Sequence, residues 1–337
     1  MFEIIAFTVI GILLAVLFVF VRLQRIRRGI HRVLSGAEDE QTLPYTQEWE
    51  LYHNEQAPSQ RTLACLTELR VDYKSHKIHL VPGFQGRVSK GFMTEVPKFQ
   101  VPILVHNGRA IYNSRRQMRY LINRHARGAL LLPATDEEDT RLAYWLNKLP
   151  GIDESDLSLV ADPKGNELFT IALPIVGAVF DQLKAKFLAR TFLLNPFFRK
   201  PLGAKALRAL TTLSILENPA LTNAFETAKE IIEDRLDEAE RALGTHGGAW
   251  IIGGTFSHID IEIMVLLYRL QQVTMLDDLL RSGRPNLAMY WERLIARPSF
   301  TIALVNQTSS VTKTATEKIR TTRAINPEFD ELFRVNH

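Results

Sequence analysis

The chain has 337 residues, which favours two domains because a domain commonly contains about 100–200 residues. Its composition is 46% hydrophobic and 23% charged, which excludes a chain that is disordered throughout. The net charge of +4 is too small to indicate a nucleic-acid partner. The single cysteine, Cys65, excludes an intrachain disulfide, and without any Cys/His cluster we expect no metal site.

An uncharged apolar run occupies residues 4–21. A helix of this length rises about 27 Å, close to the thickness of the hydrocarbon core of a bilayer. Arginines follow the run at positions 22, 25, 27, 28 and 32. The pattern predicts a transmembrane anchor with its basic flank over residues 1–24, and it places the rest of the chain in the cytosol. A cleaved signal peptide would instead require basic residues before the run, where Glu3 stands, and small residues at its end.

Residues 25–47 are predicted to form a juxtamembrane linker. Over residues 48–127 the hydrophobic pattern alternates between the period of a strand and that of a helix. We expect strands at 49–53, 73–80, 101–105 and 109–112, with helices after Pro58 and from Ser114. Asn107-Gly108 between the last two strands is a strong hairpin signal. The order βαβ followed by ββα predicts a thioredoxin-like α/β domain.

Residues 134–306 show helical periodicity almost throughout and predict an all-α second domain. The clearest helix spans 225–243, with glycines at its end. Ser257 and Asp260 have the spacing of a capping box at the start of another helix. The polar segment 307–337 is predicted to be a loosely packed or disordered tail.

The segment 168–198 is unusually apolar, and two interpretations remain open. Its second run, residues 181–198, has the pattern of a basic amphipathic helix that could lie in a membrane interface. The alternative, which we favour, is that the segment packs inside the all-α domain or forms an apolar substrate wall.

Four pairs of motifs, in this order along the chain, resemble those of glutathione transferases. The pairs are Leu51-Tyr52-His53 with Pro58–Arg61, Val101–Leu104 with Asn113-Ser114, Trp250–Gly254 with Phe256–Ile261, and Arg284–Leu287 with Arg297–Phe300. The resemblance spans roughly residues 49–306. It is nearest to the ganglioside-induced differentiation-associated protein group and the dehalogenase-like bacterial transferases. It implies that the thioredoxin-like domain binds glutathione as a co-substrate and that the second domain is an all-α glutathione transferase C-terminal domain.

The resemblance also implies which residues bind glutathione. A cis peptide bond at Val101-Pro102 exposes the main chain of Val101, which lines an open groove and pairs with the cysteinyl part of glutathione. Ser114 is expected as a helix N-cap that holds the γ-glutamyl carboxylate, with positive charge added by Arg115-Arg116. Asn113 occupies the position of a residue that contacts the amino group of glutathione.

Members of this family stabilise the glutathione thiolate with a donor that follows the first strand. A simple register places Gln56 at that position. Ser59 is the favoured catalytic residue, because a hydroxyl at the start of a helix can turn toward a thiolate and is aided by the helix dipole. Ser59 could equally be only the N-cap of that helix, and Asn54 is a third donor. We expect His53 to be a strand residue and Cys65 a core residue.

These observations predict a membrane-anchored, glutathione transferase-like protein that conjugates or reduces apolar electrophiles with glutathione. The alternative is a non-catalytic binding or scaffold module at the membrane. The expected partners are the lipid bilayer, glutathione, an apolar electrophilic substrate and a second copy of the chain in a homodimer.

The predicted anchor can be tested by deleting residues 1–40. We expect the shortened protein to fold and to remain in the supernatant without detergent, because the apolar run precedes the first predicted strand. The full chain should require detergent. Circular dichroism and sedimentation measure both properties, and a shortened chain that fails to fold would contradict the prediction.

Overall fold

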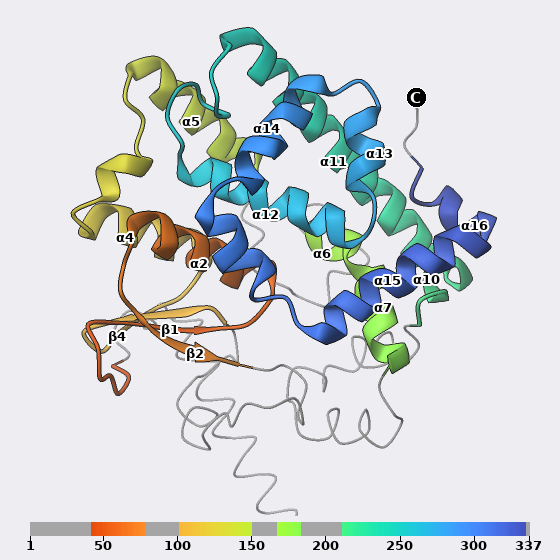
Figure 1. Ribbon diagram of the computed structural model, residues 1–337, viewed down its shortest axis with the longest axis horizontal. Helices are drawn as coiled ribbons and strands as arrows, with labels where there is room; N and C mark the ends of the chain where they lie inside the picture. Colours follow the sequence, from red (N-terminus) through yellow and green to blue (C-terminus); the bar gives the residue numbers. More distant parts are fainter. Residues whose placement is uncertain (1–41, 79–100, 150–166, 183–210, 335–337) are drawn as a thin grey trace, which may run out of the picture.

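The computed structural model describes residues 42–78, 101–149, 167–182 and 211–334. A four-stranded sheet lies at one end of the molecule, and helices α2 (Ala57–Leu69) and α4 (Ser114–Arg124) pack against one of its faces (Figure 1). The remaining helices form a second, all-helical body beside α2. The described residues thus form a thioredoxin-like α/β domain followed by a helical domain, as the sequence predicts.

The sheet has the strand order β2-β1-β3-β4. Its strands are β1 (Trp49–His53), β2 (Lys74–Lys77), β3 (Ile103–His106) and β4 (Arg109–Ile111). β1 and β2 are parallel, while β1–β3 and β3–β4 are antiparallel. All four predicted strands are therefore present, although the last three are shorter than predicted.

The side chains of the strands alternate between the two faces of the sheet. Leu51, Leu104 and Ile111 are buried on the face toward α2 and α4. Ile103 and Val105 belong to a second buried cluster. Because successive side chains of a strand point to opposite faces, one short β3 supplies both clusters.

The β3–β4 connection is the predicted hairpin. Asn107 and Gly108 both have positive φ, at 50° and 84°. A two-residue hairpin turn of this hand requires φ above zero at both positions, which Gly adopts freely and Asn tolerates. The Asn-Gly pair therefore sets the register of β4.

Helix α2 begins earlier than the sequence suggested. Gln56 is its N-cap residue, Pro58 lies in its first turn, and Ser59 is the third helical residue. The predicted N-cap role of Ser59 is wrong. Proline in a first turn has its φ fixed near the helical value and lacks only an N–H that would have no partner there, so the helix includes it.

Helix α4 is capped by Asn113, not by Ser114 as predicted. Oδ1 of Asn113 accepts a hydrogen bond from the N–H of Arg116 at 3.1 Å, and its φ is 69°. An Asn tolerates this left-handed backbone better than most residues. Ser114 is consequently the first helical residue.

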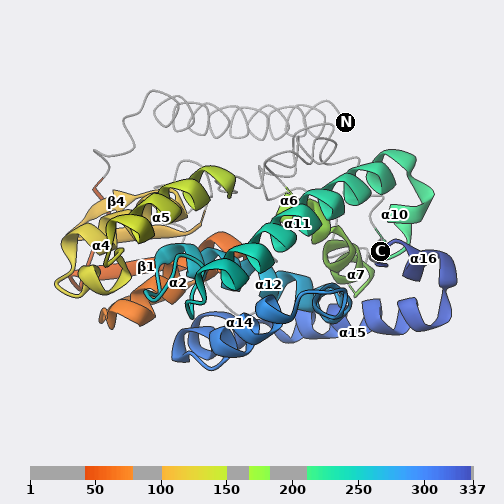
Figure 2. The same cartoon turned by 90° about the horizontal axis from the view of Figure 1, so that it is seen from above.

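The rest of the described chain is helical, which confirms the all-α prediction for those residues. The segments are η2 (Gly128–Leu131), α5 (Asp136–Lys148), α6 (Glu167–Ile171), α7 (Leu173–Gln182), α10 (Ser214–Glu217), α11 (Pro219–His246), α12 (His258–Gln272), α13 (Leu276–Arg281), α14 (Pro285–Ile295), η5 (Phe300–Val305), α15 (Ser310–Ile325) and α16 (Pro327–Glu331). Figure 2 shows α11 as the long diagonal helix of this domain. It extends past both predicted ends, from a cap at Asn218 to Gly247, whose φ of 63° stops it.

The start of α12 is fixed by the predicted capping box. The fully buried Asp260 carboxylate accepts hydrogen bonds from the N–H and the hydroxyl of Ser257, at 2.7 and 2.9 Å. It also accepts from the N–H of Ile251 at 2.9 Å and the hydroxyl of Tyr290 at 2.7 Å. One carboxylate therefore joins the loop before α12 to α12 itself and to α14.

The C-terminal segment is folded as far as residue 334, so the prediction of a loose tail over 307–337 is wrong for residues 307–334. Ala315 and Ile319 on α15, Phe329 on α16 and Phe333 just after α16 are completely buried. The Phe333 ring lies 5.4 Å from that of Phe225 on α11, with the rings edge to face. These contacts are made by only a few apolar residues, which are separated in the sequence by many polar ones. The sequence pattern therefore did not indicate buried helices.

The apolar segment 168–198 is described as far as residue 182. Leu168, Ile171 and Ala178 are buried, and α7 packs against α15, so this part lies in the core of the helical domain. The basic amphipathic part from residue 183 and the predicted anchor at 4–21 lie outside the described residues. None of the described helices has both the length and the apolar character needed to cross a bilayer.

Asp260→Ala should lower the free energy of unfolding by about 3 kcal/mol or more, because it leaves several buried donors without an acceptor. Tyr290→Phe is the matched control and should cost only about 1 kcal/mol, since it removes one of these hydrogen bonds. Urea denaturation followed by circular dichroism measures both values. Equal losses in the two variants would contradict the central role of the carboxylate.

Candidate functional site

Three chain segments meet at one edge of the sheet. β1 ends at His53, and Tyr52 lies opposite Ile103 in the β1–β3 register. Val101-Pro102, which precedes β3, therefore lies beside the loop that follows β1. β1 and β4 both run antiparallel to β3, so Ile111 leads the chain out of β4 toward this same edge.

The loop after β1 is organised by the side chain of Asn54, which is 2% exposed. Its Oδ1 accepts hydrogen bonds from the N–H of Gln56 at 2.9 Å and the hydroxyl of Ser59 at 3.1 Å. The Ser59 oxygen in turn accepts from the N–H of Asn54 at 3.2 Å. The Nδ2 donor of Asn54 is buried without a hydrogen-bond partner. The N-terminus of α2 thus carries an unused donor.

The two predicted catalytic residues have different surroundings. Ser59 is fully buried, and its hydroxyl bonds Asn54. Gln56 is half-buried, and no described residue forms a hydrogen bond with its side-chain amide. Gln56 also stands at the N-cap of α2, where the helix dipole favours negative charge.

The Val101-Pro102 peptide bond is cis, which confirms the prediction. The carbonyl of Pro102 accepts a hydrogen bond from Nε2 of Gln117 at 2.9 Å. The same nitrogen donates to the carbonyl of Ile111 at 2.7 Å, and Oε1 of Gln117 accepts from the Thr62 hydroxyl at 2.6 Å. The buried Gln117 amide therefore joins the start of β3, the end of β4 and helix α2.

Ser114 is fully buried, whereas Asn113 is exposed. Ser114, Gln117, Met118 and Leu121 form the buried face of α4. As the first helical residue, Ser114 belongs to this inward face and does not border solvent. The predicted open groove beside Ser114 is therefore wrong for its side chain.

Arg115 is engaged between the two domains. Its Nε donates to Glu262 on α12 at 2.6 Å, its Nη2 donates to the other oxygen of the same carboxylate, and Nη2 also donates to the carbonyl of Leu149. The Glu262 carboxylate is 4% exposed. The expectation that Arg115 adds positive charge to an anion site is wrong, because a carboxylate neutralises it. Bidentate geometry makes this one of the stronger kinds of ion pair.

His53 and Cys65 are buried and take no part in the site. Burial and the nearby Lys77 lower the pKa of His53 from 6.5 to about 4, so the imidazole is neutral at pH 7. Its Nε2 lies 2.7 Å from the hydroxyl of Ser75 on β2. Burial raises the pKa of the Cys65 thiol, so the core role predicted for Cys65 is confirmed.

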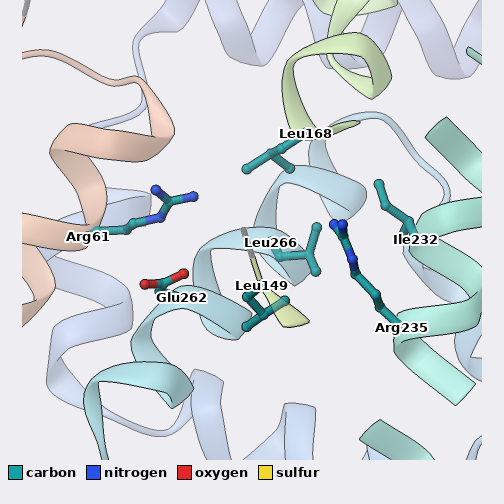
Figure 3. Close-up of a pocket in the computed structure, with 7 residues that line it drawn as sticks. All are labelled: Arg61, Leu149, Leu168, Ile232, Arg235, Glu262 and Leu266. Atoms are coloured by element: carbon teal, nitrogen blue, oxygen red, sulfur yellow. The ribbon is translucent and has the colours of Figure 1, made fainter. Parts of the chain in front are cut away.

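A cavity of about 20 Å³ lies where α2 meets α6, α11 and α12 (Figure 3). Arg61 and Glu262 approach it from one side and Arg235 from the other. Arg235 forms an ion pair with Glu167 at 2.9 Å. The volume suits about one water molecule, so this cavity is too small to be a substrate pocket.

The described residues contain no group of three or more His, Cys, Asp or Glu side chains that could hold a metal ion. Gln117 and Thr62, which hold the site together, were not predicted from the sequence. Gln117 could have been recognised from the sequence as a buried polar residue, because it lies within the apolar stripe of α4 that Met118, Leu121 and Ile122 form.

Two family models match the chain. One, described as the N-terminal domain of glutathione S-transferases, matches residues 51–129. The other, described as the C-terminal domain of glutathione S-transferases, matches residues 215–302. The glutathione S-transferase TCHQD of Arabidopsis thaliana is 24% identical over 252 residues, covering 74% of this chain and 87% of that protein.

Solved structures show the same fold. The beta-etherase LigF from Sphingobium sp. strain SYK-6 has a TM-score of 0.55 and 16% identity, covering 78% of this chain and 100% of that chain. Glutathione transferase F7 from Populus trichocarpa has a TM-score of 0.51 and 17% identity, covering 77% and 100%. Both similarities concern the arrangement of the helices and strands.

The buried His53 predicts a pH dependence of stability. The unfolded chain binds a proton at His53 below pH 6.5, whereas the folded chain does so only near pH 4. Stability is therefore fully present above pH 6.5 and falls as the pH drops through this window. The free energy of unfolding should lose about 2 kcal/mol from this group between pH 7.5 and pH 5.

His53→Gln removes the titrating group and keeps a nitrogen that can reach Ser75. Its stability, measured by urea denaturation at pH 7.5 and pH 5, should fall by about 2 kcal/mol less than that of the wild type. Burial also lowers the pKa of His258, so His258→Gln should flatten the remaining dependence in the same direction. Parallel losses in wild type and His53→Gln would show that His53 does not cause the effect.

Proposed function

Because the chain belongs to the glutathione S-transferase superfamily, we propose that it binds glutathione at the sheet edge formed by residues 54–56, Val101-Pro102 and Asn113-Ser114. It then uses the bound thiolate to conjugate or reduce apolar electrophiles. The motif order further suggests kinship with the ganglioside-induced differentiation-associated protein group and the dehalogenase-like transferases.

The observation that carries this proposal is the convergence of an unused donor, a helix N-terminus and a cis-proline segment at one edge. The Nδ2 of Asn54 is buried and unpaired. Gln56 is the N-cap residue of α2, and no described residue forms a hydrogen bond with its side-chain amide. A buried donor without a partner is costly in a folded protein and calls for an explanation. A thiolate at this position would accept hydrogen bonds from these amides and would benefit from the α2 dipole.

The peptide portion of glutathione is proposed to extend the sheet. Val101 is half-buried and directly precedes the cis bond to Pro102. Its main chain would pair with the cysteinyl unit in the manner of an added strand. The Gln117 amide fixes the carbonyl of Pro102, so this segment is held in place before glutathione arrives.

The γ-glutamyl end would meet the start of α4. The exposed Asn113 can hydrogen-bond the amino group, and the N–H groups of the first turn can receive a carboxylate. Arg115 is neutralised by Glu262 and supplies no free charge there. We therefore expect the affinity for glutathione to be modest.

The apolar run at 4–21 leads us to propose that the protein is anchored in a membrane, with both domains on the cytosolic side. Apolar electrophiles partition into bilayers, so the anchor would bring the site close to its substrates. A homodimer is part of the same proposal.

A non-catalytic binding or scaffold module is the second candidate. It is favoured by the exposed amide of Asn113, which cannot form an ion pair with the glutathione amine, and by the full burial of Ser114. Such a module would bind glutathione or another thiol without activating it.

Calorimetric titration with glutathione, followed by turnover assays with reactive aryl halides, distinguishes the two candidates. Binding with turnover supports the transferase. Binding without turnover, and without a thiolate absorbance band, supports the module. The absence of glutathione binding in a folded protein would overturn the transferase and leave the module, with another thiol or a protein partner as its ligand.

Gln56→Ala should lower kcat about a hundredfold, because removal of one donor to a developing charge commonly costs several kcal/mol. Affinity for glutathione should change little, since Val101 and the start of α4 provide it. Ser59→Ala is the matched control: by freeing Asn54 it should lower stability, and in the folded fraction it should lower kcat far less than Gln56→Ala does. The reverse result would make Ser59 the thiolate donor, as first predicted from the sequence.

A further inference from the structure

The residue between Asn54 and Gln56 is held by the C-terminal helices. The carboxylate of Glu55 accepts hydrogen bonds from the N–H of Ser309 at 2.7 Å and from its hydroxyl at 2.9 Å. Ser309 is the N-cap of α15, and its oxygen also accepts from the N–H of Thr312 at 3.2 Å. The loop that follows β1 is thereby attached to the N-terminus of a helix 254 positions further along the chain.

A second set of bonds joins the same loop to α12. Nη2 of Arg269 lies 3.5 Å from the carbonyl of Glu55, and Nη1 donates to Oε1 of Gln272 at 2.6 Å. Nε2 of Gln272 donates to the Thr308 hydroxyl at 3.3 Å, and that hydroxyl lies 2.7 Å from the Tyr268 hydroxyl. Since Thr308 precedes Ser309, the contacts close a ring from Glu55 through α15 and α12 back to Glu55.

The turn before α15 also contacts the end of β2. Nζ of Lys77 donates to the carbonyl of Gln307 at 3.3 Å, and Lys77 pairs with His53 in the sheet. Residues 307–309 thus lie against the edge at which the proposed glutathione site is formed. Figure 1 shows the start of α15 close to the sheet and to α2.

The ring also compensates the charge of Glu55. A free carboxylate beside Gln56 would repel a thiolate and disfavour its formation. Here the carboxylate lies at the positive end of the α15 dipole, and the buried guanidinium of Arg269 faces the same residue. A negative side chain is therefore tolerated next to the proposed site and serves to hold the loop.

We propose that Glu55 is a positioning residue, which fixes the donors of residues 54–56 through its bonds to Ser309 and thereby makes the C-terminal helices part of the catalytic site. The proposal rests on the transferase function proposed above. It predicts that loosening this ring disorders the loop and lowers the rate of the chemical step, while the binding of glutathione, which other segments provide, is maintained.

The test uses the full chain with Glu55→Ala, Glu55→Gln, Ser309→Ala and the double variant Glu55→Ala/Ser309→Ala. Glu317→Ala, an exposed acid on α15 that pairs only with Arg320 among the described residues, is the control. Hydrogen–deuterium exchange of peptides covering residues 49–62 is measured without ligand. Steady-state kinetics with glutathione and an aryl halide give kcat and KM for each variant.

In Glu55→Ala we expect exchange to be about tenfold faster and kcat about tenfold lower, with KM for glutathione within about twofold of wild type. Glu55→Gln should recover most of both, because its amide oxygen can still accept from the N–H of Ser309. The double variant should be no worse than Glu55→Ala, since the two residues act through one contact. The control should resemble wild type.

Wild-type exchange and kcat in Glu55→Ala, or effects of Glu55→Ala and Ser309→Ala that add fully, would overturn the proposal. If Glu55→Ala does not fold, Glu55→Gln and Ser309→Ala decide by the same measurements. If wild type shows no turnover, the transferase function fails independently, and the exchange data alone support or overturn the attachment of the loop.

Discussion

The side-chain amide of Gln117 fixes the arrangement of the three segments that it joins at the candidate site. Each of its two amide hydrogens meets a carbonyl, of Pro102 and of Ile111, and its oxygen receives the Thr62 hydroxyl. Both N–H groups and the oxygen of this amide are therefore hydrogen-bonded, as expected for a fully buried amide. A glutamate here would place a negative oxygen against a carbonyl, and a leucine would remove the hydrogen bonds to both carbonyls. The start of β3, the end of β4 and α2 are therefore held at fixed distances by one residue.

Ion pairs join this domain to the helical one. Arg115 on α4 reaches Glu262 on α12, and Arg297, after α14, pairs with Glu68 on α2. The Arg297 guanidinium also lies 3.6 Å from the centroid of the Phe256 ring, so packing supports the pair. The charges of Arg115 and Arg297 are therefore used to fix the interface between the two domains.

The sequence predicted the strands, the hairpin and the capping box, because each depends on neighbouring residues. Asn107-Gly108 adopts positive φ whatever surrounds it, and Ser257 finds Asp260 three positions away. The start of α4 at Ser114 was predicted correctly, but the N-caps of α2 and α4 were placed at Ser59 and Ser114 instead of Gln56 and Asn113. Gln117 and Glu55 were not recognised as site residues, since their partners are distant in the chain.

The same limit explains why the C-terminal helices were predicted as a tail. Their positions depend on polar bonds to distant residues as much as on apolar packing. Nζ of Lys229 on α11 donates to the carbonyls of Leu332 and Arg334, at 3.2 and 2.8 Å, and Arg323 on α15 pairs with Asp278 on α13. A polar segment of this kind looks unstructured when it is considered alone. Once α15 and α16 are fixed by these bonds, the N-terminus of α15 has a defined position, and a carboxylate in the loop after β1 can use it. The folding of the C-terminal helices and the order of the site are thus consequences of one set of long-range contacts.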